Sequence, residues 1–222
     1  MIRIENVVLP SAGQWEAVIR GMRNPKNSWE KSDSKQEAGA CQMEIGPNDH
    51  KLMMSLAKGG AVHAKYRRMI PVYADITCNH TWWAEFDTYK VGTVRNSCSK
   101  MHKIHVKEFR PEDFSHEGID EVGGIAAEQF QNTLNVLEWL RRQFNETQEK
   151  KYWRAIIELL PMGFNLKATV FLNYEVLHNI YHSRKGHKMF EWRDFCVWIE
   201  TLPYSELITV ETKAREGQDM LA

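Results

Sequence analysis

An asparagine and an arginine interrupt an apolar helix face in the segment that runs from Leu160 to Glu191. The face consists of apolar residues at three- and four-residue spacing, the pattern of a helix packed on a core: Leu172, Val176, Leu177, Ile180 and Tyr181. On a helix over residues 172 to 184, Asn173 and Arg184 fall about 20° apart at the centre of that face. A buried guanidinium is costly unless something pairs with it. We therefore expect Arg184 to meet either a neighbouring carboxylate or a ligand with an anionic or carbonyl group.

The segment RNSCSK, from Arg95 to Lys100, allows three interpretations. A thiol beside cations, as Cys98 is beside Lys100, can act as a nucleophile. A turn rich in hydroxyl groups can instead satisfy only its own backbone. Third, Ser97, Ser99 and backbone N–H groups can hold a phosphate, with Lys100 and Arg95 supplying positive charge. The third interpretation is the most attractive, because Arg184 also needs an anionic or carbonyl partner.

His178 and His182 lie four residues apart, the spacing that lets two imidazoles share a metal ion on a helix. No glutamate follows the first histidine as in an HExxH motif, and we place the pair with Glu175 on the polar helix face. A solvated or hydrogen-bonded face is therefore expected there, with no metal. Glycine-rich dinucleotide and P-loop fingerprints are also absent from the sequence, so a Rossmann or kinase assignment has no support.

Composition limits the classes of function. The chain has 222 residues, of which 43% are hydrophobic, so we expect a single domain over residues 1–222. Lys and Arg balance Asp and Glu at 29 each, which disfavours nucleic acid or an anionic membrane as the main partner. The sequence has no apolar run of membrane-spanning length and no signal-peptide pattern, which predicts a cytosolic protein. The cysteines are scattered without a CxxC pair and are expected to be reduced thiols: Cys41, Cys78, Cys98 and Cys196.

The elements that position these residues can be predicted from periodicity. Residues 1–9 and 65–77 alternate as strands do, and Pro71 places the second at a sheet edge or bulge. Ser11 and Gln14 have capping-box spacing before a helix, and Asn48 is expected to cap another that closes at residues 59–60. Residues 24–47 read as a mobile loop with a possible binding or lid role, and residues 103–124 as irregular. Helical patterns cover 81–89, around 130–144, 152–160, 172–184 and 192–202.

With these residues laid out, the chain resembles the flavin-dependent thymidylate synthases. In that family the C-terminal half reads Leu-Pro, then a helix with Asn-x-Arg, a Leu, an Asn or His, an Arg and a His-Ala-Gln-x-Glu element. Matching spacing is found here for Leu160, Pro161, Asn173, Leu177, Asn179, Arg184, His187 and Glu191. Upstream, KGGAVHAKYRRMIPVYADIT and TWWAEFDTYKVGTVRNSCSK follow the family's order of elements. The resemblance covers about three-quarters of the chain.

The chain departs from the family's pattern where that family binds flavin. Thr88-Tyr89-Lys90 stand where the family has Arg-His-Arg, and Glu175 stands where it has the Arg of Asn-x-Arg. Exchanging arginine for a carboxylate reverses the charge near a diphosphate, so we expect FAD to be bound weakly or lost. The cofactor-binding residues that the resemblance leaves are His63, Lys90, Arg95, Asn173 and Asn179.

The resemblance implies an α/β (α+β) fold with a small, mostly antiparallel sheet flanked by long helices, assembling as a homotetramer with active sites between subunits. It implies that Ser97, Cys98, Ser99, Lys100 and Arg184 bind dUMP or another pyrimidine deoxynucleotide, and that Arg184 polarises the pyrimidine ring as the catalytic residue. The reaction would be C5 methylation with reduced flavin and methylenetetrahydrofolate, or a variant of it. The alternative is a non-catalytic nucleotide-binding protein on the same scaffold.

Overall fold

The computed structural model describes residues 1–36 and 43–212, which form two compact units. The first unit contains Met1–Ile4, Asp75–Thr88 and Asn96–Thr169. The second contains Glu5–Ala74, Tyr89–Arg95 and the chain from Val170 onward. The single domain expected over residues 1–222 stays a prediction. Cys41 and part of the loop expected over residues 24–47 lie outside the described residues.

A small four-stranded sheet contributes strands to both units. In the order β1-β4-β6-β5 it contains β1 (Arg3–Val8), β4 (Pro71–Asn79), β6 (Asn165–Asn173) and β5 (Val94–Ser97). Every second residue of β4 from Val72 to Cys78 is buried, as the period of two in a strand requires. The mixture of helices with a small antiparallel sheet confirms the α+β class.

Two sequence-based boundaries and the expected position of Pro71 are wrong at this sheet. Residues 65–69 form a 3-10 helix, η3 (Lys65–Met69), and the strand starts only at Pro71. Pro71 is the first residue of a central strand, where its missing N–H costs no ladder bond, so neither an edge nor a bulge is needed. Residues 165–173 form β6, so Leu172 and Asn173 precede the helix to which the wheel assigned them.

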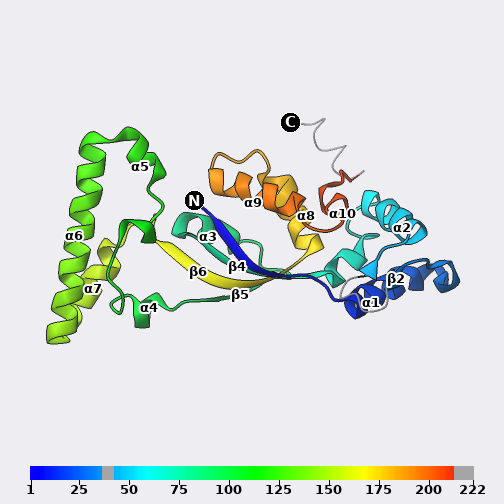
Figure 1. Cartoon of the computed structure of the whole chain (residues 1–222), viewed down its shortest axis with the longest axis horizontal. Helices are drawn as coiled ribbons and strands as arrows, with labels where there is room; N and C mark the ends of the chain where they lie inside the picture. The colour runs from blue at the N-terminus through cyan, green and yellow to red at the C-terminus, as the bar shows by residue number, and fades with distance from the viewer. Residues whose placement is uncertain (37–42, 213–222) are drawn as a thin grey trace. The chain divides into compact units, whose positions relative to one another are not determined.

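In the first unit a helical hairpin carries its own core. It is built from α6 (Gly124–Thr147) and α7 (Lys150–Leu159), preceded by α5 (Glu117–Val122), and Figure 1 shows α6 and α7 side by side. Leu134, Leu137 and Leu140 of α6 pack with Ile156 of α7 in one buried cluster. The predicted long helix and the end of the next before Pro161 are confirmed. The short helices α3 (His80–Phe86) and α4 (Lys100–Lys103) complete the α-helices of this unit among the described residues.

The second unit is mainly helical in its described residues. Its helices are α1 (Ala12–Arg23), α2 (Pro47–Lys58), α8 (Tyr174–Arg184), α9 (Phe190–Glu200) and α10 (Glu206–Thr209). The capping box of α1 is confirmed, since the Gln14 N–H donates to Ser11 Oγ and the Ser11 N–H to Gln14 Oε1. Gly46, and not Asn48, precedes the first turn of α2, because Pro47 occupies the first helical position. None of the described helices is long and apolar enough to cross a lipid bilayer.

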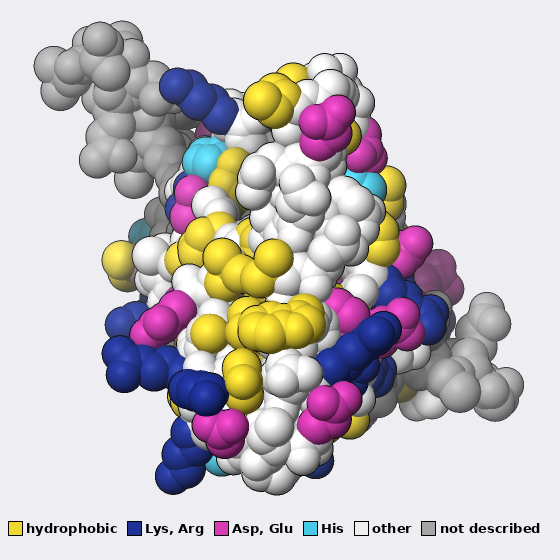
Figure 2. All heavy atoms as spheres, turned by 90° about the vertical axis from the view of Figure 1, so that its left-hand side faces the viewer, with side chains coloured by type: hydrophobic (Ala, Val, Ile, Leu, Met, Phe, Trp, Pro, Cys, Tyr) yellow, Lys and Arg dark blue, Asp and Glu magenta, His cyan; other side chains and the backbone are white. Residues whose placement is uncertain are grey.

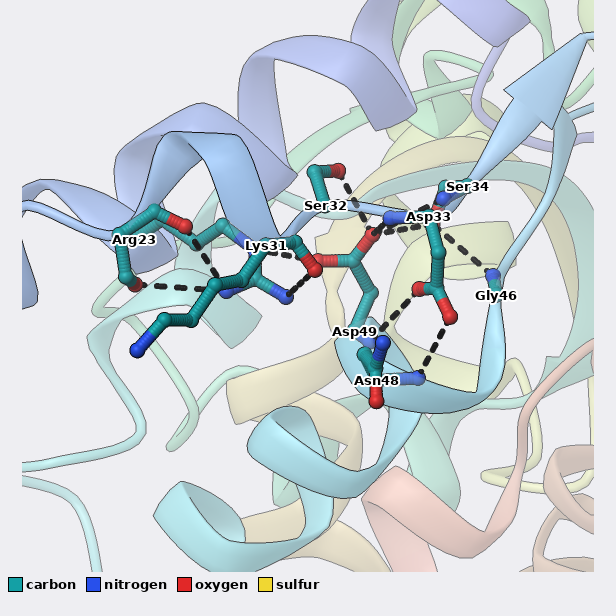
Figure 3. A network of polar contacts seen from close by, with 9 residues as sticks. Arg23, Lys31, Ser32, Asp33, Ser34, Gly46, Asn48 and Asp49 are labelled. Carbon is teal, nitrogen blue, oxygen red and sulfur yellow. Dashed lines mark hydrogen bonds and ion pairs between the residues drawn. The ribbon is translucent and has the colours of Figure 1, made fainter.

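The described part of the 24–47 loop is tied down by a buried ion pair between α1 and α2 (Figure 3). Arg23 Nε donates to Asp49 Oδ1 at 2.6 Å, and both side chains are almost completely buried. Asp49 Oδ2 accepts from the hydroxyls of Ser32 and Ser34, each at 2.7 Å. Asp33 in turn accepts from the first N–H groups of α2, at Asn48 and Asp49. Through these contacts residues 28–34 help to join α1 to α2. The contacts therefore oppose the lid role considered for this loop.

We expect Asp49→Ala to lower the free energy of unfolding by about 3 to 5 kcal/mol, because it leaves the buried Arg23 guanidinium without its carboxylate. Glu16→Ala is the matched control, since Glu16 pairs with Arg20 at 2.7 Å on the exposed surface of α1. The control is expected to cost less than about 1 kcal/mol. Urea unfolding followed by circular dichroism measures both. Equal losses in the two variants would contradict a structural role for the buried pair.

Candidate functional site

Asn173 ends β6 and caps α8, the helix that carries Arg184. Its Oδ1 accepts from the Val176 N–H at 3.0 Å, and its Nδ2 donates to the Gly92 carbonyl at 3.4 Å. Gly92 has φ of +84°, and a Cβ there would lie 2.8 Å from Asn173 Nδ2, so both the backbone turn and the close approach require glycine. The placement of Asn173 beside Arg184 on one helix face is therefore wrong. Asn173 instead joins the start of α8 to the segment 89–95.

Arg184, at the last turn of α8, is held by aromatic and imidazole groups. Its Nε donates to the Tyr89 hydroxyl at 2.9 Å, and its Nη1 lies 3.0 Å from His187 Nε2. The guanidinium carbon also lies 4.8 Å from the ring centre of Trp192, a fully buried residue of α9. Such cation–π contacts fix the plane of the guanidinium without adding a negative charge. Arg184 is thus half-buried and oriented, as a group that hydrogen-bonds a planar carbonyl or phosphate must be.

Glu175 does not lie on a solvated face. It is buried, and its Oε2 accepts from Arg67 Nε of η3 at 2.8 Å. Arg67 Nη1 donates to the Leu207 carbonyl of α10 at 3.1 Å, so the pair joins η3, α8 and α10. The positive charge of Arg67 cancels the negative charge of Glu175 within the core. The expectation that Glu175 reverses the charge near a flavin diphosphate is therefore corrected.

His178 and His182 were placed on the polar face of α8, which is also wrong. His178 is buried with its Nδ1 2.7 Å from the Ile208 carbonyl, and the His182 side chain lies 3.4 Å from Glu211. The two rings contact each other edge to face at 4.4 Å between centres. Within residues 1–36 and 43–212, no group of three or more His, Cys, Asp or Glu side chains is arranged to hold a metal ion.

The turn from Ser97 to Lys100 lies in the first unit at the end of β5. Cys98 is exposed and its N–H donates to the Lys167 carbonyl of β6 at 3.1 Å. Ser99 caps α4, because its Oγ accepts from the His102 N–H at 3.3 Å. Lys100 Nζ lies 3.0 and 3.2 Å from the two ring nitrogens of His80. The turn is thus part of a defined corner between β5, β6 and α3.

A cavity of about 590 Å³ opens beside this turn, within the first unit. Cys98, Ser99 and Lys100 line it, whereas Ser97 does not. Its other cationic residues are Arg3, Lys103, Lys107 and Lys167, against three acidic residues, Glu108, Glu112 and Asp113. Apolar side chains, among them Phe109, Phe164 and Leu166, form the remaining wall. A cavity of this size with an apolar wall and excess positive charge suits an anion attached to a flat ring system.

The cofactor-binding candidates all belong to the second unit. His63, Lys90 and Asn179 are exposed, and Arg95 is half-buried on β5. The Asn173 side chain caps α8 and donates to the Gly92 carbonyl. These contacts give Asn173 a role in positioning α8. The nucleotide-binding candidates are divided between the units, with Cys98, Ser99 and Lys100 in the first and Arg184 in the second.

Two contacts at the candidate site could not be predicted from the sequence. Arg67, the partner of Glu175, lies 108 positions away in sequence, and no local pattern links them. Tyr89 lies within the helix predicted over residues 81–89, but α3 ends at Phe86, and Tyr89 is half-buried whereas Trp82, Trp83 and Phe86 are buried. Tyr89 lies three positions past the end of α3, and no sequence pattern marked its contact with Arg184. Of the described thiols, Cys98 alone is exposed, and burial raises the pKa of Cys196 to about 12.

Solved structures of one class of enzyme share this fold. Thymidylate synthase X (ThyX) from Helicobacter pylori, solved with FAD and dUMP, matches with a TM-score of 0.64 at 15% identity, covering 94% of this chain and 96% of that chain. A second structure of flavin-dependent thymidylate synthase ThyX from Helicobacter pylori, complexed with FAD and dUMP, gives 0.63 at 14% identity over 94% and 97%. No protein-family model and no curated protein sequence matches the chain. The chain therefore has a ThyX-like fold.

We expect Glu175→Arg to destabilise the protein by about 3 to 5 kcal/mol, because it buries two guanidinium groups face to face. The exchange Arg67→Glu with Glu175→Arg is expected to recover at least about 1 kcal/mol of that loss by restoring an opposite pair. Thermal unfolding of the single and double variants measures the coupling. Purely additive losses would show that the pair contributes no net interaction.

Proposed function

We propose that this chain binds a pyrimidine deoxynucleotide, dUMP or a close relative, and methylates or otherwise alkylates it at C5. The proposal is supported by the ThyX-like fold and carried by one observation, the oriented guanidinium of Arg184 between Tyr89, His187 and Trp192. In this role Arg184 donates to O4 of the pyrimidine and withdraws electron density from the ring. That interaction strengthens as negative charge develops there, which is how a fixed donor lowers a barrier.

The phosphate is assigned to the corner at residues 98–100. Lys100 supplies a point charge, the Ser99 hydroxyl and backbone N–H groups supply donors, and further lysines stand around the same cavity. Ser97, which the resemblance also implies, does not line the cavity and is not assigned to the phosphate. Cys98 has no assigned covalent role.

We further propose a homotetramer with sites completed between subunits, as the resemblance to the flavin-dependent thymidylate synthases implies. In such an assembly one subunit supplies the phosphate corner and another supplies Arg184.

The chemical groups of the proposed cofactor-binding residues are suitable for holding a flavin. Lys90 offers an exposed cation for a diphosphate, His63 and Asn179 offer exposed hydrogen-bonding groups, and Glu175 adds no free negative charge because Arg67 neutralises it. When bound, reduced FAD would supply the hydride and methylenetetrahydrofolate the carbon unit. With one lysine in place of two arginines, however, this chain offers fewer donors to a diphosphate, so we expect weaker retention.

A non-catalytic nucleotide-binding protein is the second candidate. The observation that favours it is the occupied hydroxyl of Tyr89, which contacts Arg184 at the position where the resemblance places the histidine of Arg-His-Arg. A side chain committed to Arg184 contributes less to flavin. Flavin retention and turnover separate the two candidates.

Calorimetric titration with dUMP tests the nucleotide proposal. We expect Arg184→Ala to weaken binding by about 2 to 4 kcal/mol, the usual cost of removing one partner of a charge-assisted contact. Arg193→Ala is the control, because Arg193 lies on α9 with its guanidinium carbon 4.2 Å from the Phe190 ring and is not assigned to the nucleotide. Unchanged affinity in folded Arg184→Ala would refute the assignment.

Lys100→Met is expected to weaken binding of dUMP at least tenfold more than binding of deoxyuridine, because only the nucleotide carries the phosphate. The comparison of the two ligands within one variant removes any general effect on folding. Lys103→Met, which alters another lysine of the same cavity, shows how far the effect is specific to Lys100. Equal losses for the two ligands would move the phosphate elsewhere.

The visible spectrum of the purified protein tests the flavin. We expect a preparation with less than one FAD per chain, and a flavin spectrum that rises on incubation with FAD. Lys90→Ala is expected to lower the remaining affinity for FAD about tenfold, which is the usual effect of losing one charge contact near the protein surface. A protein that never takes up FAD, yet binds dUMP, would favour the non-catalytic candidate.

A further inference from the structure

A second cavity, of about 600 Å³, lies beside the end of α1 within the second unit. Among the described residues its lining has three cationic side chains and no acidic one: Arg23, Lys26, Ser28, Lys31, Asn48 and Leu52. The cavity beside Lys100 has a different lining, which lies in the first unit. A concave surface lined by cations without carboxylates attracts an anionic ligand.

The two lysines of this cavity have no carboxylate partner. Lys26 and Lys31 are exposed and form no ion pair within residues 1–36 and 43–212. Figure 3 shows the Lys31 side chain extending away from the buried network around Asp49. On the side of the helical hairpin, by contrast, basic side chains lie among acidic ones (Figure 2), and three of them pair with glutamates: Arg142 with Glu138, Lys151 with Glu149, and Arg154 with Glu158. Lys26 and Lys31 can therefore bind an anion without giving up a contact of the fold.

Arg23 adds a buried and fixed guanidinium to the wall of the cavity. Its side chain is 4% exposed, and Nε donates to Asp49 Oδ1. Its Nη1 donates to the carbonyl and hydroxyl oxygens of Ser28, and its Nη2 donates to the Lys31 carbonyl at 3.0 Å. A guanidinium has five N–H donors, and these contacts use at most four of them. One N–H on Nη2 is therefore available to an acceptor in the cavity.

The backbone that carries these residues is already shaped for binding. Two 3-10 turns, η1 (Asn24–Lys26) and η2 (Trp29–Lys31), follow α1, and Asn27 between them is left-handed with φ of +43°. Asparagine tolerates this conformation better than most residues. Because Arg23 holds the carbonyl groups of Ser28 and Lys31, a ligand does not have to order the segment.

The lining favours a small polar ligand without a flat ring. Leu52 is its one apolar residue in the described part of the chain, and no aromatic side chain belongs to it. Asp49 balances the charge of Arg23, so the two lysines set the net charge, which matches the 1.5 to 2 negative charges of a phosphate monoester at about pH 7. Ser28 and Asn48 offer a hydroxyl and an amide beside that phosphate, groups that hydrogen-bond the hydroxyls of a sugar.

We propose that this cavity binds a sugar phosphate. Lys26 and Lys31 hold the phosphate, Arg23 donates its remaining N–H, and the polar groups of Ser28 and Asn48 contact the sugar hydroxyls. The site is separate from the proposed nucleotide site and depends on neither Arg184 nor the nucleotide function. Because the Arg23–Asp49 pair joins α1 to α2, a ligand bound at Arg23 also stabilises that junction.

Calorimetric titration of the full chain with ribose 5-phosphate tests the site. Lys26→Met with Lys31→Met is expected to weaken binding at least about tenfold, because it removes both charge contacts with the phosphate. Lys103→Met with Lys107→Met is the control, since it makes the same change of charge at the cavity of the first unit, and it is expected to stay within about threefold of wild type. No binding by the wild type up to about 10 mM, wild-type affinity in the first variant, or a larger loss in the control would overturn the proposal.

Hydrogen exchange measured by mass spectrometry locates the ligand. Saturating ribose 5-phosphate is expected to slow amide exchange in residues 23–34 of the wild type, and to have no such effect in Lys26→Met with Lys31→Met. Ribose without the phosphate is expected to protect neither protein. Protection confined to residues 98–113 would assign the ligand to the other cavity and refute the site. Equal affinity for inorganic phosphate and ribose 5-phosphate would refute the contacts with the sugar.

Discussion

The buried ion pair between Arg67 and Glu175 is the interaction on which the second unit depends. It joins η3, the first turn of α8 and, through the Leu207 carbonyl, α10. Two buried charges are costly to desolvate, so such a pair is weak evidence for high stability, but its loss on one side leaves an unpaired charge in the core. Its main consequence is positional. With Glu175 held by Arg67 and Asn173 capping the helix, the direction of α8 is fixed at its first turn, and Arg184 is set at its last.

The same pair changes how the sequence departures are to be understood. Considered alone, a glutamate in place of a flavin-binding arginine reverses the charge of the site. Arg67 pairs with Glu175, so the two charges cancel within the core. Relative to the family, the chain therefore lacks one hydrogen-bond donor, but the sign of the local potential is not reversed. The remaining deficit relative to the family lies at residues 88–90, where Lys90 is a point charge and Tyr89 contacts Arg184. The flavin site that we propose is therefore expected to be weak for lack of donors, without repulsion.

Local patterns predicted the elements of this fold well where one periodicity dominates. The capping box at Ser11 and the long helix through Leu134 are examples. Prediction failed where two periodicities meet, as at Leu172, whose position suits both the alternation of β6 and the stripe of α8. The helical wheel placed Asn173 on α8 for the same reason, although its side chain shows the cap geometry that ends a strand and begins a helix.

The candidate site was less predictable, because its contacts are long-range. Spacing identified Arg184 as a residue that needs a partner, and the contacts with Tyr89, His187 and Trp192 show how it is oriented. Spacing also identified the corner at Ser99 and Lys100, but not that a cavity lies beside it.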